Sequence, residues 1–113
     1  MLQRLLSEFL HLEGLEHALL MDDRGLLLSS VGPIGTLPPV QPTVELTSAA
    51  LDAAVNTGFG DLQEVWIEGS QTTMIDVVTP HRILMLHGEG GQTARWRHTV
   101  DRLRKQLATT PEF

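Results

Sequence analysis

The sequence contains no cysteine, so it can form no disulfide bond and carry out no thiol chemistry. It also has no apolar run of the ~18 residues that a membrane-spanning helix requires. The leucine-rich start is interrupted by Arg4 and Glu8, which makes it a poor signal peptide. No myristoylation or prenylation motif is present. These absences predict a cytoplasmic protein that does not insert into a membrane.

Charge is unevenly spread along the chain. The 113 residues include 14 acidic and 8 basic side chains, for a net charge of −6. An acidic chain is a poor general binder of nucleic acid, because phosphate contacts dominate that affinity. Five of the eight basic residues nevertheless fall in one predicted helix: Arg95, Arg97, Arg102, Arg104 and Lys105. They either face solvent or meet an acidic patch of a partner, and the sequence leaves both interpretations open.

Apolar side chains at three- and four-residue steps predict three helices. The first covers residues 2–13 and ends at Gly14, the second covers 44–57, and the third starts at a Thr93 cap and frays from residue 108. The third helix carries its apolar residues on one narrow stripe: Trp96, Val100, Leu103 and Leu107. Prolines and glycines predict an irregular loop over 32–42.

Short apolar segments between turn residues predict five strands, over 17–21, 26–31, 62–68, 72–78 and 83–86. The first two are joined by an acidic turn, in which Gly25 is expected to have a positive φ. Connections this short require antiparallel pairing. The sequence therefore predicts one domain over 1–113, an α+β sandwich in which three helices flank a five-stranded antiparallel sheet, in the order αββαβββα.

The middle helix has more apolar surface than one sheet can cover. At ~100° per residue its polar side chains collect in one arc, made of Glu45, Ser48, Asp52 and Asn56. A surface helix needs an apolar stripe only a little over ~100° wide, and this helix has roughly twice that. It is therefore expected to pack on its own sheet and on a partner. The alternative is that its alanines simply favour helix formation.

No group of residues in the sequence resembles a catalytic or metal site. The glycines at 88–91 precede a helix but lack the lysine of a phosphate-binding loop. The histidines, which are scattered and lack metal-ligand spacing, are His11, His17, His81, His87 and His98. Asp61 and Glu64 have no evident partner. We therefore expect no catalytic residue, no metal ligand and no cofactor, and we do not predict an enzyme.

The ordered set of segments resembles the roadblock / dynein light chain domain family. The first matching segment, from Gly14 to Gly32, reads GLEHALLMDDRGLLLSSVG. The second runs from Leu46 to Ile67 and comprises an alanine-rich helix, a glycine turn and a strand. The third, over 83–107, reads ILMLHGEGGQTARWRHTVDRLRKQL and looks like the last strand, glycine loop and C-terminal helix of that family.

The resemblance implies a fold in which the central helix covers one face of the sheet and the terminal helices cover the other. It also implies a homodimer formed through the central helix and the strand after it. The residues expected in that interface are Leu46, Ala49, Ala50, Ala53, Ala54, Val65, Trp66 and Ile67. The polar arc of the central helix, Glu45, Ser48, Asp52 and Asn56, is expected to contact a further partner.

Members of this family in bacteria and archaea often accompany Ras-like small GTPases as activators or scaffolds. The resemblance therefore implies a regulator that supplies no catalytic group of its own. Two alternatives remain open. One is a structural subunit that assembles through the same helix. The other is a small-molecule sensor, which the large aliphatic residues of the predicted core disfavour because they offer no polar anchor.

Overall fold

The computed structural model describes residues 1–33, 40–58, 60, 62–89 and 93–111, without the side chains of 40–43 and 93. Its helices are α1 (Leu2–Ser7), the short 3₁₀ helix η1 (Glu8–His11), α2 (Val40–Asn56) and α3 (Thr93–Thr109). Its strands are β1 (Leu15–Asp22), β2 (Leu27–Val31), β3 (Glu64–Glu68), β4 (Thr72–Thr79) and β5 (Arg82–Gly88). The element order therefore agrees with the predicted order, apart from the extra 3₁₀ turn.

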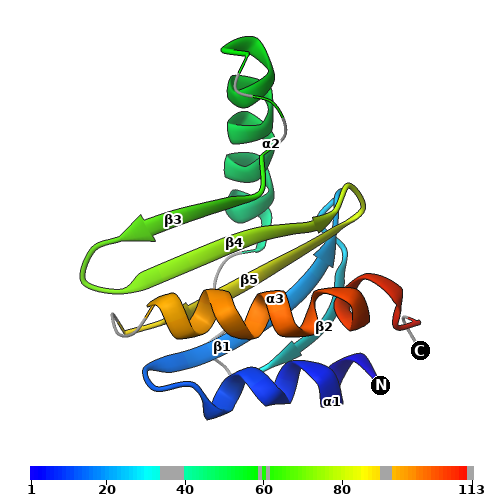
Figure 1. Cartoon of the computed structure of the whole chain (residues 1–113), viewed down its shortest axis with the longest axis vertical. Coiled ribbons are helices and arrows are strands. Elements are labelled where there is room, and N and C mark those ends of the chain that lie inside the picture. The colour runs from blue at the N-terminus through cyan, green and yellow to red at the C-terminus, as the bar shows by residue number, and fades with distance from the viewer. Residues whose placement is uncertain (34–39, 59, 61, 90–92, 112–113) are drawn as a thin grey trace.

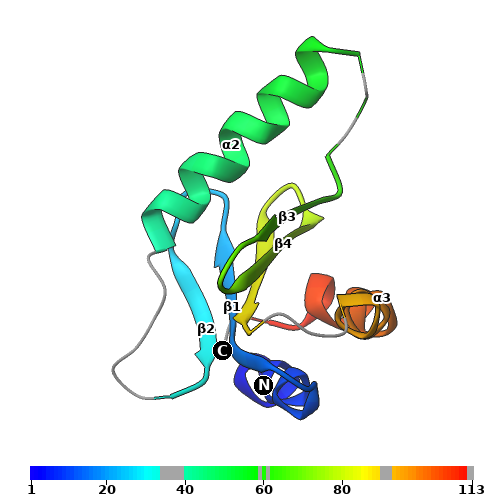
Figure 2. The same ribbon diagram turned by 90° about the vertical axis from the view of Figure 1, so that its left-hand side faces the viewer.

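The five strands form one antiparallel sheet in the order β2-β1-β5-β4-β3. Strands β2 and β3 are its two edges (Figure 1). Helices α1 and α3 lie on one face, while α2 crosses the other (Figure 2). This arrangement confirms the predicted α+β sandwich.

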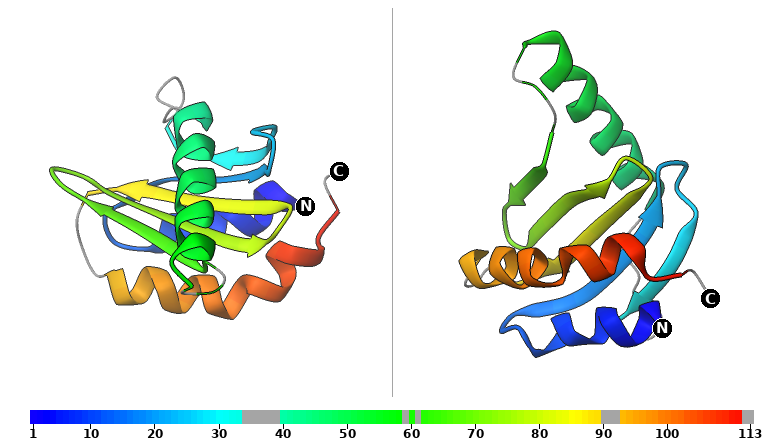
Figure 3. Two further views of the ribbon diagram at one scale, coloured as in Figure 1. Left: turned by 90° about the horizontal axis from the view of Figure 1, so that it is seen from above. Right: turned by 45° about the vertical axis from the view of Figure 1, so that its right-hand side comes forward.

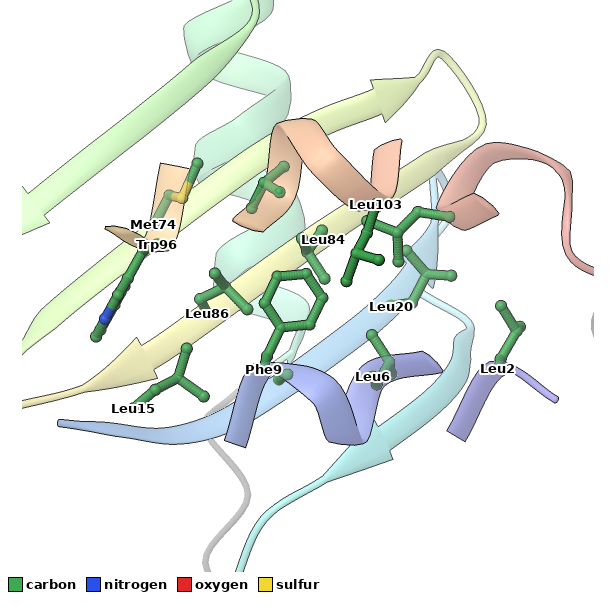
Figure 4. Packing of buried hydrophobic residues seen from close by; sticks show 13 residues of the cluster. Leu2, Leu6, Phe9, Leu15, Leu20, Met74, Leu84, Leu86, Trp96 and Leu103 are labelled. Carbon is green, nitrogen blue, oxygen red and sulfur yellow. The ribbon is translucent and has the colours of Figure 1, made fainter. Parts of the chain in front are cut away.

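The main core lies between the sheet and the helices α1 and α3. Trp96, Val100, Leu103 and Leu107 of α3 are all buried, so the predicted apolar stripe is confirmed. They meet the buried residues of α1, η1 and the sheet (Figure 4), which are Leu2, Leu6, Phe9, Leu15, Ala18, Leu20, Met74, Leu84 and Leu86. A core of this kind fixes the position of α3 against the sheet, because its packing leaves little room for other arrangements.

A second, smaller cluster lies on the face that α2 crosses. Val44 of α2 packs there against sheet residues, and Val65 of the edge strand adjoins them. The buried sheet residues of this cluster are Leu19, Met21, Ile75, Ile83 and Met85. The buried side chain of Val44 thus helps to hold α2 on the sheet.

Two glycines that the sequence places at chain reversals have the positive φ angles that such positions favour. Gly14, after the first helical segment, has φ 82°, and Gly25, in the β1–β2 turn, has φ 92°. In the second turn, Asp22 Oδ1 accepts hydrogen bonds from the backbone N–H groups of Leu26 at 2.8 Å and Arg24 at 2.9 Å. These bonds, the one from Leu26 foremost, lower the pKa of Asp22.

Several predicted boundaries differ from those of the structure. The first helical segment ends at His11 and not at residue 13, and β3 begins at Glu64 and not at residue 62. The loop over 32–42 ends earlier than expected, because α2 already begins at Val40. Pro42 is compatible with this start, since the N–H groups of a first helical turn have no partner inside the helix. Thr93 is the first residue of α3 and does not precede it, and the helix continues through Thr109. Residues 34–39, within the predicted loop, lie outside the described part.

Candidate functional site

Helix α2 leaves the sheet soon after it begins. Val44 and Thr47 are 6% and 1% exposed, but Leu46 is 40% and Val55 66% exposed. The C-terminal half of the helix projects beyond the sheet (Figures 1 and 3). The helix therefore presents to solvent much of the apolar surface that the sequence indicated.

The exposed apolar side chains of α2 do not all lie on one side. Val44 and Thr47 belong to the row of side chains that faces the sheet. At ~100° per residue, a second row lies on a different side of the helix, well away from this sheet-facing row. We call this second row the α2 stripe, and its members are Leu46, Ala49, Ala50 and Ala53. All four are exposed or half-buried, and three of them are alanines. A row of small side chains allows another backbone to approach closely. Ala54, which was predicted in the same interface, is half-buried on the sheet side of the helix.

The edge strand β3 divides the other predicted interface residues between two faces. Val65 and Ile67 lie on the face that α2 crosses, and Ile67 is 44% exposed. Trp66 lies on the opposite face, where its ring stacks on Trp96 of α3 with centroids 6.4 Å apart. The structure thus places Ile67, but not Trp66, on the same side of the sheet as the α2 stripe.

The predicted polar arc of α2 is exposed along its whole length. All its members are exposed: Glu45, Ser48, Asp52 and Asn56. They occupy the side of the helix between the sheet-facing row and the α2 stripe. A partner that reached the α2 stripe of one molecule would therefore lie beside two carboxylates.

A charged cluster between the sheet and α3 was not predicted. Asp76 of β4 is 1% exposed at its side chain, and Arg104 holds it with two hydrogen bonds, of 2.7 and 3.0 Å. Arg104 also bonds to Asp101 at 3.0 Å. The bond to Asp76 raises the pKa of Arg104 above its already high ordinary value. Beside this cluster, Glu64 forms an ion pair with Arg97, although the sequence indicated no partner for Glu64.

Two of the scattered histidines meet on the face that α2 crosses. The register of β1 and β5 pairs His17 with His87, whose rings stack with centroids 6.3 Å apart. His87 Nδ1 lies 2.7 Å from Thr73 Oγ1, and its Nε2 lies 2.8 Å from Gln71 Oε1. Burial, and secondarily the charge of His17, lower the pKa of His87, while Glu16 opposes this. Both ring nitrogens of His87 are thus already engaged.

In the described part of the chain, no three histidine or carboxylate side chains lie close enough together to bind a metal ion. None of the helices there is both long and apolar enough to span a bilayer. What this part of the structure presents is an exposed surface built from the α2 stripe, the polar arc and Ile67.

Solved structures with this architecture include a Roadblock/LC7 domain from Streptomyces avermitilis. It matches with a TM-score of 0.83 at 20% identity, over 94% of this chain and 93% of that one. The gliding protein MglB from Thermus thermophilus matches at 0.74 and 22% identity, over 93% and 84%. An MglB with a tetrameric arrangement matches at 0.75 and 23% identity, over 93% and 83%. No protein-family model and no curated protein matches the sequence.

Proposed function

We propose that this chain, which has the fold of the Roadblock/LC7 domains, acts as a homodimeric regulator or scaffold of a Ras-like small GTPase. The observation that carries the proposal is the exposure of the α2 stripe together with Ile67 on the neighbouring edge strand. Apolar side chains exposed together on one side of a helix and on an edge strand support a contact with another protein. The tetrameric arrangement of an MglB with the same fold supports self-association.

In the proposed dimer, the α2 stripes of two molecules pack against each other and the β3 edges approach. Pairing of the two edges would also remove an unpaired strand, which is an aggregation hazard. The polar arcs of both copies would then border one continuous surface. The sequence resemblance, together with the fold shared with the gliding protein MglB, supports a small GTPase as the molecule that this surface contacts. A GTPase partner of this class acts in the cytoplasm, so the proposal places the chain there too.

The proposed role requires no catalytic group from this chain. A GTPase changes its switch loops between its GDP and GTP states, and a partner shifts that equilibrium only by binding one state more tightly. A dimer surface that fits the GTP-bound loops would stabilise the arrangement in which the GTPase hydrolyses its own nucleotide. We therefore expect preferential binding to the GTP form and faster hydrolysis.

Two measurements test the proposal in sequence. Light scattering at micromolar concentration should report a mass of at least twice the 12.5 kDa chain mass, and a monomer would contradict the dimer. Titration of the Ras-like GTPases of the source organism, loaded with GDP or with a non-hydrolysable GTP analogue, should then show tighter binding of one GTP-loaded protein. Equal affinity for the two forms with no change in hydrolysis would favour the alternative, a structural assembly subunit.

A further inference from the structure

We propose that the outer face of α3 binds an acidic segment of a protein partner. Four exposed side chains recur there at steps of three, four and three residues: Arg95, His98, Arg102 and Lys105. At ~100° per residue they lie within an arc of about 80°. We call this row the α3 stripe. With a rise of ~1.5 Å per residue, it extends about 15 Å along the helix.

The structure separates the five basic residues of α3 into two sets. Arg97 and Arg104 are turned toward the sheet and bind its carboxylates. Arg102 lies in the α3 stripe, 3.5 Å from Glu8, and both side chains are more than half exposed. Exposed pairs of this kind are weak and exchange readily. Arg95 and Lys105 form no ion pair within the described residues, so their charges remain available.

The α3 stripe lies on the basic side of an acidic protein. Residues 1–13 and 93–109 contain six basic and three acidic side chains, a net +3, so the rest of the −6 chain carries −9. Because Arg97 and Arg104 are paired with carboxylates of the sheet, the layer keeps a net charge of +1 and the remainder −7. These two segments form the layer of α1, η1 and α3 (Figure 2), whereas Glu45 and Asp52 lie on α2 across the sheet. An acidic partner would be repelled elsewhere and steered to this layer, because complementary charge guides association.

The surroundings of the α3 stripe favour an extended acidic segment over a lipid surface. Glu8 and Asp101 flank the row and are 51% and 60% exposed. A flat anionic membrane would press against both carboxylates, whereas a narrow chain laid along the helix can pass Asp101 and has only to displace Glu8 from its weak pair with Arg102. Near the end of the row, a hollow of about 250 Å³ is lined by Arg4, Glu8, Gln106 and Thr110 among others. Its cation Arg4 and its polar groups lie along the path of such a chain, beside the Glu8 carboxylate that pairs with Arg102.

The test uses the whole protein and a fluorescein-labelled peptide of ten glutamates, with a ten-glutamine peptide for comparison. Fluorescence anisotropy at low ionic strength should show saturable binding of decaglutamate only, weakening as salt is added. The double change Arg95→Glu and Lys105→Glu should weaken binding by about tenfold or more, because it reverses two charges of the row. Arg24→Glu, an equally exposed change in the β1–β2 turn, should leave the affinity within about twofold.

Amide chemical shifts of the wild-type protein should change along residues 94–106 when decaglutamate is added. Equal melting temperatures for the variants would show that the loss of affinity is not unfolding. The proposal is overturned if decaglutamate does not bind, or if Arg24→Glu weakens it as much as the double change. It is also overturned if vesicles of phosphatidylglycerol and phosphatidylcholine sediment the protein while decaglutamate does not bind, since the occupant would then be a lipid surface.

Discussion

Arg104 of α3 and Asp76 of β4 form a bidentate ion pair, with N–O distances of 2.7 and 3.0 Å. The carboxylate is almost completely buried, while one third of the arginine side chain is exposed. A buried charge of this kind is tolerated only because its partner supplies matched hydrogen bonds. The pair therefore fixes how α3 lies on the edge half of the sheet, next to β3.

Removal of the arginine should destabilise the domain strongly. Arg104→Met leaves the Asp76 carboxylate buried without its main partner, and we expect a loss of about 3 kcal/mol in the free energy of unfolding. The matched control is Arg102→Met on the same helix, whose exposed pair with Glu8 should contribute less than about 1 kcal/mol. Urea denaturation of both variants provides the measurement. If the two variants lost similar amounts of unfolding free energy, the buried pair would stabilise the domain no more than the exposed pair does.

The turn between β1 and β2 should tolerate no side chain at Gly25. Its φ of 92° is unfavourable for any residue with a Cβ. Gly25→Ala should therefore lower the free energy of unfolding by about 1 kcal/mol or more. Gly69→Ala serves as the control, because that glycine is not among those with positive φ and the added Cβ would meet nothing closer than 3.9 Å. An unchanged melting temperature for Gly25→Ala would contradict this account of the turn.

Elements with a local signal could be predicted from the sequence, and contacts between distant segments could not. The stripe of α3 follows from apolar spacing alone, and the positive φ of Gly25 follows from its place in an acidic turn. Asp76 and Arg104, in contrast, are 28 residues apart. Nothing local distinguishes Asp76 from an outward-facing residue of an alternating strand. The contact becomes visible only once α3 is placed on β4.

The same limit applies to the candidate site. The excess apolar surface of α2 and its polar arc were recognisable, because helical periodicity reports which side chains share a side. The start of α2 at Val40 was missed, since Pro42 also fits a loop. The pairing of His17 with His87 requires knowledge that β1 and β5 are neighbours in the sheet. Neither residue alone has a pattern that indicates this.

Protonation of His87 should make the domain less stable in mild acid. The pKa of His87 in the folded protein is lowered from 6.5 by burial and by His17, so the unfolded chain binds a proton more readily. The stabilisation is therefore fully present above pH 6.5 and is lost as the pH falls through the lower folded-state pKa. Melting temperatures between pH 7.5 and 5 should fall more steeply for the wild type than for His87→Gln. If the melting temperatures of the two proteins fell with pH at the same rate, His87 would not be the source of the acid sensitivity.

A charge placed in the α2 stripe should prevent dimer formation. Ala53→Arg adds a long cation to a row of small side chains, where it would be desolvated without a partner. Light scattering should report a monomer at concentrations where the wild type is dimeric. Val55→Arg is the matched control, because Val55 lies on the opposite side of the same helix and is 66% exposed. If Val55→Arg dissociated the dimer and Ala53→Arg did not, the interface would lie on the Val55 side of α2, which would contradict the proposed dimer.

A charge reversal in the polar arc should separate partner binding from dimer formation. Asp52 is exposed and lies outside the α2 stripe, so Asp52→Arg should change stability by less than about 0.5 kcal/mol and leave the dimer intact. If the polar arcs border the GTPase surface, this change should weaken binding of the GTP-loaded partner by about tenfold, while binding of the GDP form stays weak. Asp23→Arg, in the β1–β2 turn and outside the polar arc, carries the same reversal and should bind like the wild type. Isothermal titration of each dimer with the two nucleotide forms makes the comparison. If Asp52→Arg binds normally while Ala53→Arg abolishes binding, the GTPase depends on dimer formation but contacts another face, and the polar arc is not the partner surface.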